Sequence, residues 1–69
     1  MKIDELRMNF TYLINGYVTD QVTKTRLLAL VLRGDVPAKA ILADLTPYLS
    51  GVVTEADAKI VKDIVFNFC

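Results

Sequence analysis

Apolar residues recur at steps of three and four along most of this chain, which is the spacing of amphipathic helices. The pattern predicts a first helix over about residues 3–15, whose stripe comprises Ile3, Leu6, Phe10, Leu13, Ile14 and Tyr17. Asp4 and Glu5 fall in its first turn, where the positive end of the helix dipole favours acids. Asn15 and Gly16 are a suitable C-terminal stop, because both tolerate a left-handed backbone.

A continuous apolar run over residues 27–32 dominates the second segment. Thr19 or Asp20 can cap a helix over about 20–33, and Gly34 can end it. Six consecutive apolar residues go right round a helix, so this helix needs cover on every side. We therefore expect it at the centre, wrapped by the other elements, with any second protein covering the edges of the first and last helices.

A third helix is predicted over about residues 37–49. Asp35 is its expected N-cap, and Pro37 suits the first turn, where its missing N–H costs nothing. Pro47 cannot donate to the carbonyl of residue 43 and clashes with it, so we expect the helix to break there.

A fourth helix is predicted over about residues 54–68. Thr54 can cap the N–H of residue 57, and Asp57 can replace the glutamate of a capping box. The whole chain, 1–69, is thus expected to form a single all-α domain, a compact bundle of four short helices with short connections.

Composition adds the question of a partner. The 69 residues are 54% apolar, whereas about 45–50% is usual even when glycine is counted. A small domain has proportionally more surface, so this excess is hard to bury within one copy. The high apolar content for a domain of this size therefore favours self-association or a permanent protein partner.

The polar residues form no recognisable catalytic or metal-binding set. The chain has no histidine and one cysteine, Cys69, which excludes an intramolecular disulfide and a zinc cluster. Ser50 has no histidine to activate it, and the acidic residues are scattered. We expect no enzyme activity, no cofactor and no metal. No apolar run reaches the length of a membrane span, and an acidic N-terminus without an apolar stretch is not a signal peptide, so we expect a cytoplasmic protein.

Two sets of residues are candidates for binding. Aromatic and methionine side chains at the edges of the stripes suit a protein interface or the rim of the core; they are Met8, Tyr12, Tyr17, Tyr48, Phe66 and Phe68. Cations on the second and third helices suit an acidic partner or nucleic acid, or simply flank an apolar helix; they are Lys24, Arg26, Arg33 and Lys39.

These features lead to three hypotheses. The first is a small non-catalytic protein that acts by protein–protein contact, as an adaptor, assembly subunit or inhibitor, and forms a homodimer; its size also suits a phage or mobile-element protein. The second is a dimeric helix-turn-helix-like DNA-binding regulator that reads DNA with residues 37–45, although zero net charge and a single cation there, Lys39, count against it. The third is a lipid or small-ligand carrier, which requires a cavity inside the bundle.

Overall fold

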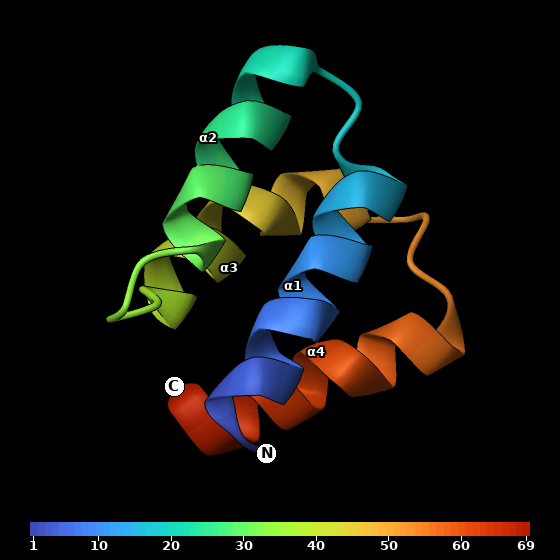
Figure 1. The fold of residues 1–69 in the computed structure, drawn as a ribbon. Coiled ribbons are helices and arrows are strands. Elements are labelled where there is room, and N and C mark those ends of the chain that lie inside the picture. The colour runs from blue at the N-terminus through green and yellow to red at the C-terminus, as the bar shows by residue number, and fades with distance from the viewer.

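The chain folds into four helices without a strand, and the computed structural model describes all residues 1–69 (Figure 1). The helices are α1 (Ile3–Tyr17), α2 (Gln21–Val31), α3 (Ala38–Leu49) and α4 (Glu55–Phe68). The all-α fold class and the four helices expected from the apolar stripes are confirmed. Two of the three expected side-chain N-caps are also present, because Asp20 accepts from the Thr23 N–H at 2.9 Å and Thr54 from the Asp57 N–H at 3.2 Å.

Helices α1 and α3 each pack against the other three helices, whereas α2 and α4 lie apart (Figure 1). The first of them, α1, contributes the largest share of the fully buried side chains. Four of its side chains are fully buried: Leu6, Phe10, Leu13 and Ile14. The remaining core side chains are Val18, Leu27, Val31, Ala38, Ile41, Leu42, Leu45, Leu49 and Ile64.

The expectation that the apolar run of α2 is buried on all sides is wrong. Leu27 and Val31 are in the core, but Ala29 is exposed and Leu32 is 80% exposed. The reason is that α2 lies at the edge of the fold, where α1 and α3 cover one side of it and nothing covers the other.

Both expected glycine stops are also wrong. α1 continues through Asn15 and Gly16 to Tyr17, whose hydroxyl bonds to α4, so tertiary contacts extend the helix. α2 ends at Val31 rather than at residue 33, and Gly34 does not take up a left-handed conformation. Only Gly51, after α3, has a positive φ, of 80°.

The start of α3 and the expected break within it differ from the sequence prediction. Pro37 occupies the N-cap position without a side-chain cap, and Asp35 accepts hydrogen bonds from Arg33 instead. The helix runs unbroken through Pro47. Pro47 and Ala43 both lie on the exposed side, where water can satisfy the carbonyl that proline leaves free, while burial of Leu45 and Leu49 holds the helix together.

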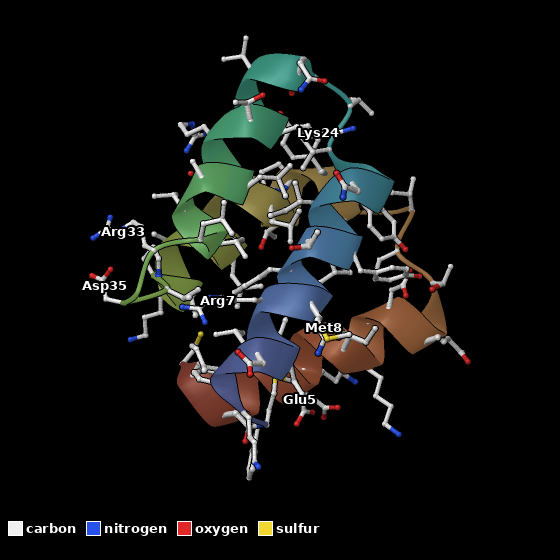
Figure 2. The ribbon with its side chains drawn as sticks, viewed as in Figure 1. Glu5, Arg7, Met8, Lys24, Arg33 and Asp35 are labelled. Carbon is white, nitrogen blue, oxygen red and sulfur yellow. The ribbon has the colours of Figure 1, made fainter.

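The C-terminal end of α2 is capped from another helix. Arg7 of α1 donates from Nε to the carbonyl of Val31 at 3.2 Å and from Nη2 to that of Arg33 at 3.0 Å. Figure 2 shows its side chain reaching from α1 to the loop after α2. The guanidinium thus satisfies carbonyls that a helix end leaves unpaired, at the negative end of the helix dipole.

We expect Arg7→Met to lower the free energy of unfolding by about 1–2 kcal/mol, since it removes two charged hydrogen bonds to the backbone but keeps the apolar stem. Urea denaturation followed by circular dichroism measures this loss. Arg26→Met is the matched control, because Arg26 forms only a half-exposed ion pair and its loss should change stability by less than about 1 kcal/mol. Equal losses in the two variants would contradict the capping role.

Candidate interaction surfaces

A buried carboxylate joins α1 to the start of α4. Asp57 is 7% exposed and accepts hydrogen bonds from the hydroxyls of Tyr12, at 2.9 Å, and Tyr17, at 2.5 Å. The Tyr17 hydroxyl also accepts from the Thr54 N–H at 3.3 Å, so Asp57 does not complete a capping box as the sequence suggested. The cluster fixes the N-terminus of α4 against α1.

These hydrogen bonds set the titration of the cluster. The hydrogen bond from Tyr17 contributes most to holding the pKa of Asp57 below its ordinary value, while burial opposes the shift. The hydrogen bond to Asp57 raises the pKa of Tyr12. A second tyrosine–aspartate pair joins α3 to the start of α2, where the Tyr48 hydroxyl donates to Asp20. Hydrogen bonds from Thr23 and then from Tyr48 lower the pKa of Asp20 to about 2.

Both lowered pKa values predict a loss of stability in acid. A carboxyl whose pKa is lower in the folded state stabilises the fold above its unfolded pKa and loses this contribution as the pH falls. We therefore expect the urea midpoint to fall as the pH drops from about 4 to about 2. The variant Asp20→Asn/Asp57→Asn should be less stable at neutral pH and show a flatter decline in acid. An equally steep decline in this double variant would assign the pH dependence to other groups.

The six candidate interface residues fall into two groups. Tyr12, Tyr17 and Tyr48 bond to carboxylates within the fold, and Phe68 packs at the edge of the core. Met8 and Phe66 have no such role and are 71% and 89% exposed. Figure 2 shows Met8 and Glu5 on the side of α1 next to α4. Met8 and Phe66 are thus the members of this set that remain free to meet a partner.

Two of the four candidate cations form ion pairs within the fold. Arg26 pairs with Asp44 at 2.7 Å and Arg33 with Asp35 at 3.0 Å; Figure 2 shows the second pair at the outer side of the loop after α2. Lys24 and Lys39 have no ion-pair partner. The structure therefore brings no cluster of free cations together on α2 and α3.

A further exposed surface was not identified from the sequence. We define the outer face of α2 as Val22, Thr25 and Ala29 together with Leu32, the C-cap residue of the helix; all four are exposed on the side away from the core. Val22 and Leu32 are 81% and 80% exposed. Their spacing is the signal that could have revealed this face, because steps of three, four and three place four residues in one line along a helix.

The fold has no pocket, and no group of three or more acidic or cysteine side chains is arranged to hold a metal ion. The cavity that a lipid or small-ligand carrier requires is therefore not present. No helix has both the length and the apolar character needed to cross a bilayer.

The fold and surfaces define the chain as a small four-helix protein with exposed apolar side chains. No protein-family model, curated protein or solved structure matches it.

Proposed function

We propose that this chain is a non-catalytic protein that acts through protein–protein contact and forms homo-oligomers, in the manner of an adaptor, an assembly subunit or an inhibitor. The observation that carries the proposal is the exposure of large apolar side chains. Phe66, Val22, Leu32 and Met8 are each more than 70% exposed in a chain of 69 residues. Single exposed apolar residues are ordinary, but this number on so small a surface favours cover by protein.

The charge distribution supports association between like copies. The chain carries eight cations and eight anions, so two copies meet without net repulsion. Cys69 is exposed and free, which suits a reducing compartment such as the cytoplasm.

Sedimentation equilibrium over a range of concentrations tests this function. We expect the average mass to rise from the 7.7 kDa of one chain toward a multiple of it. A mass that stays at one chain at every concentration would remove self-association from the proposal. Partner capture from the native host would then be needed to support any contact function.

A DNA-binding regulator remains a second proposal, supported by the two unpaired lysines, Lys24 and Lys39. It requires a dimer, since one copy offers too few cations to neutralise several phosphates. Residues 32–37 separate α2 from α3, which is longer than the usual three- or four-residue turn of a helix-turn-helix. A gel shift at low salt with the wild type and Lys39→Glu tests this proposal, and absence of a shift for the wild type would refute it.

A further inference from the structure

We infer that two copies of this chain pack antiparallel through the outer face of α2, around a two-fold axis. This inference depends on the proposed function, for which it names the partner and the surface. The face includes two of the most exposed apolar residues of the chain, Val22 and Leu32, and no charged residue.

The residue order of this face is complementary to itself. Its spacing is that of the a and d positions of a coiled coil. When a second copy is turned antiparallel, Val22 lies against Leu32 of that copy, and Thr25 against its Ala29. Each of these cross-dimer pairs thus joins two different side chains. Thr25 and Ala29, at the middle of the face, are small and let the two backbones approach closely. A two-fold interface requires such a match, because the same surface serves both copies.

The charges beside the face also fit a second copy. Arg26 lies next to the middle of the face and pairs with Asp44, with both side chains about half exposed. The two-fold axis brings this pair close to the same pair of the other copy, so each arginine meets an aspartate from either chain. A strongly acidic or basic partner would instead have to break the Arg26–Asp44 and Arg33–Asp35 pairs.

The size of the face indicates a weak dimer. A standard interface buries about 800 Å² per partner, just under a fifth of the 4396 Å² that the chain exposes. The 11 residues of α2 span only about 16 Å, so one helix face supplies less than that area. We therefore expect a weak dimer that associates transiently.

Sedimentation equilibrium of Ala29→Arg tests the inference. Arginine is a good helix former at this exposed position, so the fold should be kept, which a thermal melt verifies. Its bulk at the closest approach, next to Arg26 of the other copy, should raise the dimer dissociation constant at least about tenfold. Val22→Ser/Leu32→Ser should raise it similarly by removing the apolar ends.

Met8→Ser/Phe66→Ser is the matched control, because it removes two equally exposed apolar residues from α1 and α4. The dimer of this control variant should have the same dissociation constant as the wild-type dimer. If the control weakens the dimer while Ala29→Arg does not, the interface lies elsewhere; the inference is then wrong while the proposed self-association stands. A wild type that never associates would contradict both.

Discussion

Phe10→Ala is expected to remove most of the free energy of unfolding and bring the protein close to its unfolding midpoint at room temperature. Phe10 is the largest fully buried side chain, and it lies on α1, which packs against all three other helices. Truncating a buried phenylalanine costs about 3–5 kcal/mol, from lost apolar burial and the cavity left behind. A 69-residue domain has a total stability of the same order, about 5 kcal/mol.

Far-UV circular dichroism during thermal and urea denaturation measures this effect. Met8→Ala is the control, because it lies on the same helix but is 71% exposed, and its effect should stay within about 0.5 kcal/mol. A cooperative unfolding transition of Phe10→Ala close to that of the wild type would contradict this contribution of Phe10 to the core.

Ile64→Ala is expected to release α4 from the fold. Ile64 is the only fully buried apolar side chain of α4, so its truncation should cost about 2–5 kcal/mol. The hydrogen bonds at Asp57 hold the start of α4 but not its middle. We therefore expect local opening of α4, which exposes its amides, before the other helices unfold.

Hydrogen exchange by NMR distinguishes local from global opening. The amides in the second half of α4 should exchange much faster in Ile64→Ala, while those around Phe10 keep more of their protection. Val65→Ala is the neighbouring control, since Val65 is 47% exposed and its truncation removes little buried area. Equal acceleration in all four helices would show that α4 does not open as a separate unit.

The sequence predicted the elements that pack on one side only. The buried residues of α1 all belong to its predicted stripe, and α4 buries Ile64 against the core, so helical spacing predicted both helices. Asp20 and Thr54 were predictable as N-caps because each bonds to an N–H three residues away. Interactions this local can be read from a single segment.

The errors arise where distant residues decide the structure. The position of α2 at the edge depends on how the other helices pack. The apolar run over residues 27–32 does not specify that packing. Arg7 from α1 caps the end of α2, and Tyr17 extends α1 past Gly16, and neither contact is visible in the local pattern. Asp57 looked like part of a cap but accepts from two tyrosines more than 30 residues away.

A disulfide exchange experiment tests the antiparallel α2 interface most directly. In a Cys69→Ser background, Thr25→Cys and Ala29→Cys are prepared as separate proteins, then mixed and oxidised. Antiparallel packing places Cβ atoms of these two positions in different copies close enough to bridge, whereas each position lies about one helical turn from itself in the second copy. We predict that the mixture forms the covalent dimer between the two variants much faster than either variant forms its own. Faster linkage within either variant alone, or none above the level of a Met8→Cys control, would contradict the interface.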